Sequence, residues 1–175
     1  MIKKVVIIGP ESTGKSTLSQ QLAAYFQEPW VPEFARTYLD HLHRPYREED
    51  LLNIARGQIR EEEQQAAKAN RLLICDTDLY VIKVWSEHKY QSCHHWILEE
   101  IARRTYDLYV LTYIDVPWVD DPQREHPQPE MRLYFFRIYL DIVIHSQVPW
   151  ILVKGNAQQR LHTAVKEIEG MLHKS

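Results

Sequence analysis

The sequence contains few cysteines and no long apolar segment. Cys75 and Cys93 are its two cysteines, too few for a disulfide framework, and Cys75 lies in an apolar run that favours a buried, unreactive thiol. The start "MIKKVVIIGP" has a basic tip, but its apolar stretch stops after four residues, which is too short for a signal peptide or a membrane span. We therefore expect a protein of the reducing cytoplasm that does not enter a membrane.

Excess positive charge and clustered metal ligands are also missing. The formal net charge is -3, so the sequence lacks the long-range attraction on which non-specific nucleic-acid binding depends. The "CHH" stretch at 93–95 has no second ligand cluster at zinc spacing and predicts an ordinary helix start. We expect neither a nucleic-acid partner nor a zinc site.

The composition is that of a folded globular protein. Hydrophobic residues make up 45% of the 175 residues and charged residues 26%, and no internal repeat or flexible linker interrupts the chain. This predicts one domain over residues 1–175. Five short apolar runs predict strands at 3–8, 30–33, 72–75, 107–114 and 150–153.

Helical patterns alternate with these strands. The first, third and fifth runs are continuously apolar, as expected when helices cover both faces of a parallel sheet, which predicts an α/β three-layer fold. Two sets of residues recur at helical spacing and should pack inward. They are Leu161, Val165, Ile168 and Leu172, and Leu133, Phe136, Leu140 and Val143.

Two further segments stand out by composition. Residues 47–68 predict a charged helix whose acidic run at 61–63 forms a solvated face, with Leu52, Ala55 and Ile59 buried. Residues 115–130 hold four prolines and no glycine before a long helix begins. Such a long loop in a compact domain is typically functional or mobile.

The stretch "GPESTGKST" at 9–17 satisfies the pattern G-x-x-x-x-G-K-[ST] between a predicted strand and a predicted helix. Glycines let successive backbone N–H groups turn inward, and the helix N-terminus adds positive potential for a phosphate chain. In this motif Lys15 bridges the outer phosphates of ATP, and the Ser16 hydroxyl ligates Mg²⁺.

Carboxylates follow the third and second predicted strands. Asp76 ends the third strand and suits a magnesium ligand held through water, although "DTDLY" also resembles a helix start that Asp76 or Asp78 would cap. Glu33, after the second strand, is placed to accept the proton of an attacking hydroxyl, and Arg36 to orient the acceptor or bind a phosphate on it. The same two residues also suit a surface ion pair.

The proline-rich loop contains Arg124, and Arg132 follows near the start of the next helix. Both arginines would stabilise the charge of a transferred phosphoryl group if the loop closes as a lid, whereas arginines are also common in solvent-exposed loops and Arg132 also suits an ordinary helix face. After the fifth strand, Asn156 and Ala157 stand where a turn runs past an adenine ring and offers backbone contacts.

Other sequence motifs limit the classes of phosphate-transfer or hydrolysis reaction that the protein could catalyse. The sequence lacks N-K-x-D, so a GTPase switch is not expected, and it lacks the acidic pair of mechanical ATPases. A kinase that acts on a ribonucleoside remains the first interpretation. A nucleoside monophosphate kinase, with Arg36 on an acceptor phosphate, and a nucleotide-binding regulatory ATPase remain as alternatives.

The segments "GPESTGKSTL", "VPEFAR", "CDTDLYVIKVWSE" and "WVDDPQR", in this order, resemble the ribosylnicotinamide kinase domain of NadR-type proteins of NAD metabolism, from Ile2 to about Leu172. The resemblance implies a P-loop kinase fold with strand order 2-3-1-4-5 and ATP-dependent phosphorylation of the 5′-hydroxyl of nicotinamide riboside. Its implied nucleotide site comprises Gly9, Glu11, Ser12, Thr13, Gly14, Lys15, Ser16 and Thr17, with lid residues Arg124 and Arg132 and acceptor residues Glu33, Arg36, Asp76 and Asp78.

The pyridinium ring of that riboside is cationic and attracts aromatic faces and carboxylates. Candidate contacts are Tyr80, Trp85, Trp118, Asp120 and Asp121, although Tyr80 and Trp85 also suit the core and the aspartates also suit loop caps. The chain departs from NadR-type proteins in having no room for their adenylyltransferase and DNA-binding regions, so we expect the mononucleotide as its product. Pro122 stands where those proteins often have glycine, which would stiffen the lid.

Overall fold

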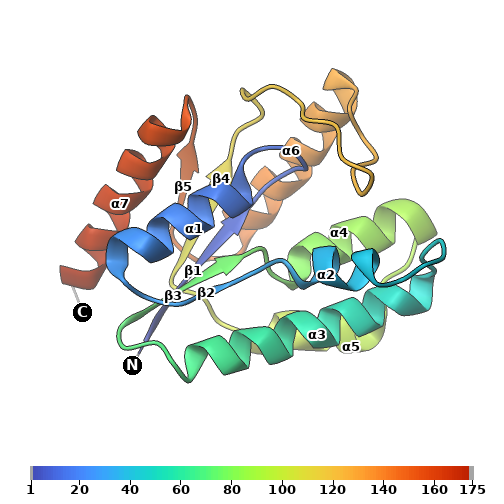
Figure 1. Ribbon diagram of the computed structural model, residues 1–175, viewed down its shortest axis with the longest axis horizontal. Helices are drawn as coiled ribbons and strands as arrows, with labels where there is room; N and C mark the ends of the chain where they lie inside the picture. Colours follow the sequence, from blue (N-terminus) through green and yellow to red (C-terminus); the bar gives the residue numbers. More distant parts are fainter. Residues whose placement is uncertain (1, 174–175) are drawn as a thin grey trace.

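The computed structural model describes residues 2–173 and contains one five-stranded, all-parallel sheet (Figure 1). The strand order is β2-β3-β1-β4-β5, which confirms the predicted α/β fold and topology. The strands are β1 (Lys3–Ile8), β2 (Trp30–Val31), β3 (Leu72–Asp76), β4 (Leu108–Thr112) and β5 (Trp150–Val153). Each lies within a predicted run or within one residue of it.

Within residues 2–173, seven helices pack on the two faces of the sheet (Figure 1). They are α1 (Lys15–Phe26), α2 (Phe34–Asp40), α3 (Glu48–Ala66), α4 (Leu79–Tyr90), α5 (His95–Arg103), α6 (Pro129–His145) and α7 (Ala157–His173). Helices α1 and α7 pack on one face, around Leu22, Val110 and Ile168. Helices α4 and α6 cover the other face, and α2, α3 and α5 extend that layer around Leu51 and Ile97. None of the helices in residues 2–173 is both long enough and apolar enough to cross a bilayer.

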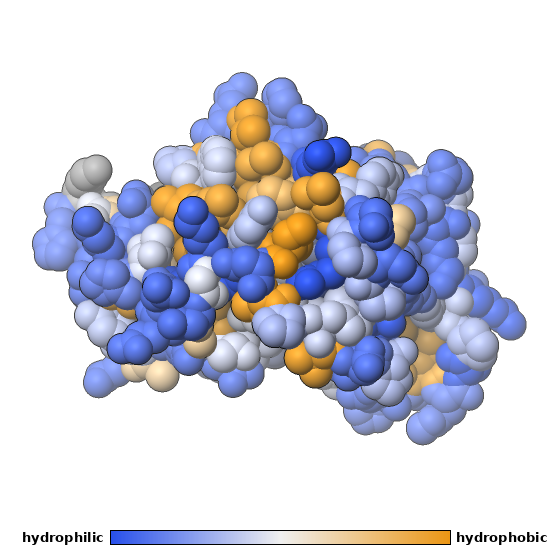
Figure 2. All heavy atoms as spheres, turned by 90° about the horizontal axis from the view of Figure 1, so that it is seen from above, coloured by the Kyte–Doolittle hydropathy of each residue, from blue (hydrophilic) through white to orange (hydrophobic). Residues whose placement is uncertain are grey.

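Three expectations about burial need correction. β5 is not covered on both faces, because it lies at the sheet edge and Trp150 and Leu152 are 37% and 38% exposed. Leu133 was expected to pack inward with Phe136 but is 37% exposed, and the buried face of α6 uses Phe135 and Tyr139 instead. Apolar side chains accordingly appear on the face shown in Figure 2.

The acidic run on α3 is also not fully solvated. Glu62 is 2% exposed and accepts hydrogen bonds from Lys4 Nζ at 2.7 Å and from the Tyr106 hydroxyl at 3.0 Å. Arg104 reaches the same carboxylate at 3.5 Å. A buried carboxylate is tolerated only with such partners, and all of them come from distant parts of the chain.

The parallel strands bring several loops to one edge of the sheet. β1 runs into the loop before α1, β2 is followed by Glu33, and β3 ends at Asp76. The segment of residues 113–128, which joins β4 to α6, crosses above this edge (Figure 1). The carboxyl ends of parallel strands are where ligands of open α/β sheets bind.

Candidate nucleotide and acceptor site

The loop between β1 and α1 has a conformation that its glycines and threonine make possible. Gly9 and Gly14 adopt φ of 147° and 78°, and a Cβ on Gly9 would meet the backbone oxygen of Thr112 at 3.0 Å. Thr13 is fully buried and its hydroxyl lies 2.7 Å from both the Pro10 carbonyl oxygen and the Thr112 hydroxyl. The loop is thereby fixed to the end of β4, with its backbone arranged as a cradle for an anion.

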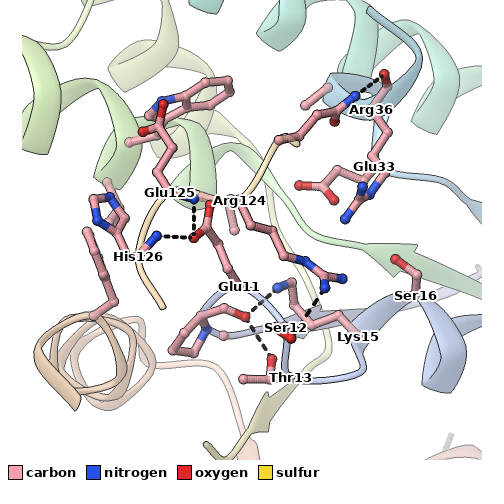
Figure 3. A pocket seen from close by; sticks show the side chains of 18 of the residues that line it. Glu11, Ser12, Thr13, Lys15, Ser16, Glu33, Arg36, Arg124, Glu125 and His126 are labelled. Carbon is pink, nitrogen blue, oxygen red and sulfur yellow. Dashed lines mark hydrogen bonds between the residues drawn. The ribbon is translucent and has the colours of Figure 1, made fainter. Parts of the chain in front are cut away.

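Lys15 begins α1 and lies in this cradle (Figure 3). Its Nζ donates a 2.7 Å hydrogen bond to the Pro10 carbonyl. Burial lowers the pKa of Lys15, and the nearby carboxylates of Glu33, Asp76 and Glu11 counteract that shift. The ammonium group is thus held in a site with three surrounding carboxylates.

Asp76 is the most unusual carboxylate of the site. It is 1% exposed, and neither of its carboxylate oxygens has a hydrogen-bond partner among residues 2–173. Burial, with repulsion from Glu33, raises the pKa of Asp76 to about 6, while the nearby Ser16 hydroxyl and Lys15 ammonium oppose the shift. A buried carboxylate without partners beside a serine hydroxyl matches the hard oxygen ligands that Mg²⁺ prefers.

No group of three or more His, Cys, Asp or Glu side chains in residues 2–173 is arranged to hold a metal ion. Mg²⁺ keeps several waters and binds mainly through substrate phosphates and one or two protein oxygens. The Ser16 hydroxyl and the Asp76 carboxylate are two oxygen donors of this kind, and they stay the predicted ligands.

Asp78 points away from the phosphate loop. Its carboxylate caps α4 by accepting from Tyr80 N at 2.9 Å, and it accepts from the Tyr109 hydroxyl at 2.8 Å. Thr77 between the two aspartates has φ of 73°, a left-handed conformation that non-glycine residues rarely adopt. This turn directs Asp76 and Asp78 to different environments. The helix-capping interpretation therefore holds for Asp78 and not for Asp76. Neither aspartate lines the cavity, although Asp76 lies close enough to Lys15 to affect its pKa.

Segment 113–128 is docked on the phosphate loop. The Glu11 carboxylate accepts hydrogen bonds from Glu125 N and His126 N, each 3.2 Å long. The Ser12 hydroxyl accepts from Val119 N at 2.9 Å. Two side chains of the loop thus hold the backbone of the segment at two separate places, and Figure 3 shows the contacts made by Glu11.

Both predicted arginines, Arg124 of this segment and Arg132 in the first turn of α6, reach the phosphate loop. Arg124 Nη1 lies 3.4 Å from the Ser12 hydroxyl and bonds the Val119 carbonyl. Arg132 Nη2 donates to the Ser12 and Val116 carbonyls at 3.3 and 3.0 Å. The Trp118 ring lies 6.0 and 5.8 Å from their guanidinium carbons. Arg124 lines the cavity and Arg132 does not, because its bonds anchor the segment from outside.

Glu33 and Arg36 both line the cavity but do not pair with each other. Arg36 Nη1 instead forms a 2.7 Å ion pair with Asp121, which places α2 against segment 113–128. Asp121 also accepts from Gln123 N at 2.9 Å, whereas Asp120 bonds the Trp118 indole at the surface. Within residues 2–173 Glu33 forms no ion pair with an arginine, although it lies near both Arg36 and Lys15. Asp120 lies outside the cavity.

The cavity has a volume of about 200 Å³ and extends from the phosphate loop to an aromatic wall. Trp85 on α4 belongs to this wall, and its indole donates a 2.9 Å hydrogen bond to the Tyr46 hydroxyl. Tyr80 does not line the cavity. Sequence reasoning did not single out the other residues of this wall, among them Val81, Val84, His88, His126, Phe135 and Tyr139.

Sequence reasoning also missed Arg160 on α7. This side chain is 3% exposed and donates to the carbonyls of Thr13, Tyr113 and Gly155 at 2.6, 3.0 and 2.8 Å, and it pairs with Asp115. It thereby ties the phosphate loop to the ends of β4 and β5. Asn156 starts α7 by exchanging hydrogen bonds with Gln159 at 2.9 Å and does not line the cavity.

These features define a class of protein. A parallel sheet of this strand order, a phosphate loop with a lysine inside it, and a metal-suited carboxylate at the end of β3 are the features of the P-loop kinase fold. Residues 4–160 match the family model AAA_28, "AAA domain", and the chain belongs to that family.

Comparison with known proteins also finds similarity to NadR. The chain is 27% identical over 160 residues to the trifunctional NAD biosynthesis/regulator protein NadR of Salmonella typhimurium, a match that covers 87% of this chain and 38% of that protein. The chain thus spans less than half the length of this relative. The resemblance drawn from the sequence is confirmed.

Two solved structures of NadR support the fold. A structure in complex with NR superposes with a TM-score of 0.82 at 19% identity, and covers 98% of this chain and 50% of that one. A structure in complex with NAD and AMP-PNP gives a TM-score of 0.77 at 20% identity with the same coverage.

Proposed function

We propose that this protein is an ATP-dependent kinase that phosphorylates the ribose 5′-hydroxyl of nicotinamide riboside to give nicotinamide mononucleotide. The observation that carries this proposal is one cavity that joins a phosphate cradle around Lys15 to an aromatic wall around Trp85. The similarity to NadR, one structure of which is in complex with NR, supports the choice of acceptor.

In this proposal, ATP binds at one end of the cavity and the nucleoside binds at the other. The β- and γ-phosphates of ATP bind to the backbone N–H groups of residues 9–17 and to Lys15, which exchanges the Pro10 carbonyl for a phosphate oxygen. The nucleoside lies against Trp85 and His88, where aromatic faces attract a cationic ring. Its hydroxyl is thereby directed toward the γ-phosphate.

Proton transfer falls to Glu33. This carboxylate lines the cavity, lies close enough to Lys15 and Asp76 to affect both pKa values, and has no arginine partner. It is therefore available to accept the proton of the attacking hydroxyl. Arg124, brought in by segment 113–128 as a lid, stabilises the charge on the transferred oxygens and helps exclude water.

Ser16 and Asp76 would hold Mg²⁺, which neutralises phosphate charge when bound with ATP. Binding of this cation would relieve the unfavourable burial of the Asp76 carboxylate. We place this function in a soluble cytoplasmic enzyme, in keeping with the cysteine content.

The structure favours a nucleoside over a nucleoside monophosphate as acceptor. Arg36 is the residue that would bind an acceptor phosphate, and its guanidinium is already paired with Asp121 at 2.7 Å. A phosphorylated acceptor would have to compete with that carboxylate.

The test is an acceptor assay with purified protein, ATP and Mg²⁺. Nicotinamide riboside, adenosine, nicotinamide mononucleotide and thymidine monophosphate are compared at equal concentration by product chromatography. We expect mononucleotide from the riboside and no product in a Lys15→Ala control. Faster phosphorylation of either monophosphate would establish the nucleoside monophosphate kinase instead. ATP hydrolysis that no acceptor stimulates would favour the regulatory ATPase.

A further inference from the structure

A second cavity of about 490 Å³ lies on the face of the sheet covered by α4, α5 and α6, away from the phosphate loop. This volume is within the range of small-molecule sites. Its lining residues are Asp78, Leu79, Tyr80, Leu98, Ile101, Ala102, Arg104, Thr105, Tyr106, Tyr109, Ser146 and Val148. None of them lines the cavity of the proposed kinase site.

The walls of this second cavity are aromatic and aliphatic. Three tyrosines contribute to it: Tyr80 from α4, Tyr106 from the loop before β4, and Tyr109 from β4. The rings of Tyr106 and Tyr109 lie edge to face, with centroids 5.8 Å apart. Leu98 is 40% exposed at α5, so apolar surface continues to the outside of the molecule. Such a lining suits a planar ring.

The charges of the lining are unbalanced. Asp78 is 2% exposed, and its carboxylate accepts only from a hydroxyl and a backbone N–H among the described interactions, with no ion pair. Arg104, the one basic side chain of the lining, is already directed at three other carboxylates. These are Glu62, Glu63 and Glu100, at 3.5, 2.9 and 3.1 Å. A ligand therefore meets the buried Asp78 carboxyl group, which has no ion-pair partner among the described residues, and a guanidinium that is already paired with carboxylates.

We propose that this second cavity binds a small planar aromatic cation. The tyrosine rings attract a cation through their π-systems, and the ligand would supply the positive partner that Asp78 lacks. An anion of the same shape would face that carboxylate and gain nothing from Arg104. The site is separate from the kinase cavity, so the proposal holds whichever acceptor the kinase uses.

Binding here would also be communicated to the kinase cavity. Asp78 and Tyr80 start α4, and the same helix presents Val81, Val84 and Trp85 to the kinase cavity. A ligand that contacts the first turn of α4 can shift that wall, which predicts a change in turnover without competition with ATP.

Three probes of nearly equal shape test the proposal: benzamidine, benzamide and benzoate, which are cationic, neutral and anionic. Each is titrated into the ¹⁵N-labelled full chain while backbone amide shifts are followed. We expect saturable shifts with benzamidine at residues 78–80, 98–102 and 104–109. Benzamide should bind at least tenfold more weakly, and benzoate should cause no shift there.

Two variants from different walls block the cavity without disturbing the core. Ala102→Trp and Thr105→Trp each place an indole in the cavity from an exposed lining position. Glu99→Trp is the matched control, because Glu99 is exposed on α5 but does not line the cavity. Benzamidine affinity should fall at least tenfold in whichever blocking variant retains the wild-type amide spectrum and remain unchanged in Glu99→Trp. The proposal is overturned by absent shifts, by shifts confined to the phosphate-loop cavity, by equal binding of benzoate, or by a blocking variant that folds and binds normally.

Discussion

Replacing Asp76 by asparagine should make the nucleotide-free protein more stable at alkaline pH while removing its magnesium-dependent activity. The carboxylate is buried, lacks hydrogen-bond partners and is repelled by Glu33. Its charge therefore destabilises the fold until a cation binds. Asparagine keeps the shape of the side chain but removes its charge. The free-energy cost of burying the charge and the ability to bind Mg²⁺ should therefore be lost together.

The size of the effect follows from the pKa of Asp76, which burial raises from 3.8 to about 6. Because the folded state holds this proton more tightly than the unfolded state, stability falls as the pH rises from about 4 through 6 and stays low above that range. The full difference corresponds to about 3 kcal/mol. About 2 kcal/mol of it accrues between pH 4.5 and pH 8.

The assay is thermal unfolding of wild type and Asp76→Asn at pH 4.5 and pH 8 without nucleotide. The variant should gain about 4 to 8 °C relative to wild type on going to pH 8. Comparing the two pH values cancels the constant cost of burying an amide. Added ATP and Mg²⁺ should then stabilise wild type more than the variant.

Asp50→Asn is the matched control. Asp50 is also buried, but Arg44, Arg47 N and the Tyr38 hydroxyl bond its carboxylate and hold its pKa well below the usual value, with Arg44 the main cause. Its charge stabilises the fold above the unfolded pKa, so this variant should lose stability at pH 8. A pH-independent difference for Asp76→Asn, or full activity of that variant across magnesium concentrations, would refute our reasoning about Asp76.

Three further variants test the parts of the site. Arg124→Ala should lower kcat about a hundredfold and change ATP affinity less, and equal losses would contradict its role in the transition state. Glu11→Ala should increase hydrogen exchange at Glu125 N and His126 N at least tenfold, because both lose a charged acceptor, and unchanged protection would show that other contacts hold the segment. Arg160→Met should lower the free energy of unfolding, measured by urea titration, by about 3 kcal/mol. An unchanged free energy would mean that water replaces the guanidinium as hydrogen-bond donor to its four partners.

The sequence predicted the strands and the phosphate loop well because both depend on local pattern. Apolar runs locate buried strands whatever their neighbours, and the loop motif carries its own glycines and lysine. The strand order came from the resemblance to NadR-type proteins. Burial at the sheet edge was not predictable from the runs, since β5 reads like β1 but has a neighbour on one side only.

Residues that act through distant partners were the ones that the sequence did not reveal. Glu62 and Arg160 are ordinary charged residues in helical patterns, and their burial depends on β4 and on the loops around it. The different environments of the Asp76 and Asp78 side chains depend on one backbone angle at Thr77. A pattern of residue types contains no direct signal for that angle.

The attachment of segment 113–128 to Glu11 and Ser12 has a consequence for the order of events. The anchors belong to the loop that receives ATP, while Glu125 and His126 belong to the wall that receives the acceptor. An arriving triphosphate brings negative charge next to the Glu11 carboxylate and disturbs the bonds that position this wall. Binding of the nucleotide should accordingly change the affinity for the acceptor, and binding of the acceptor should change the affinity for the nucleotide. Initial rates measured at varied concentrations of both substrates should show this coupling, and the coupling should vanish when Glu11 is replaced.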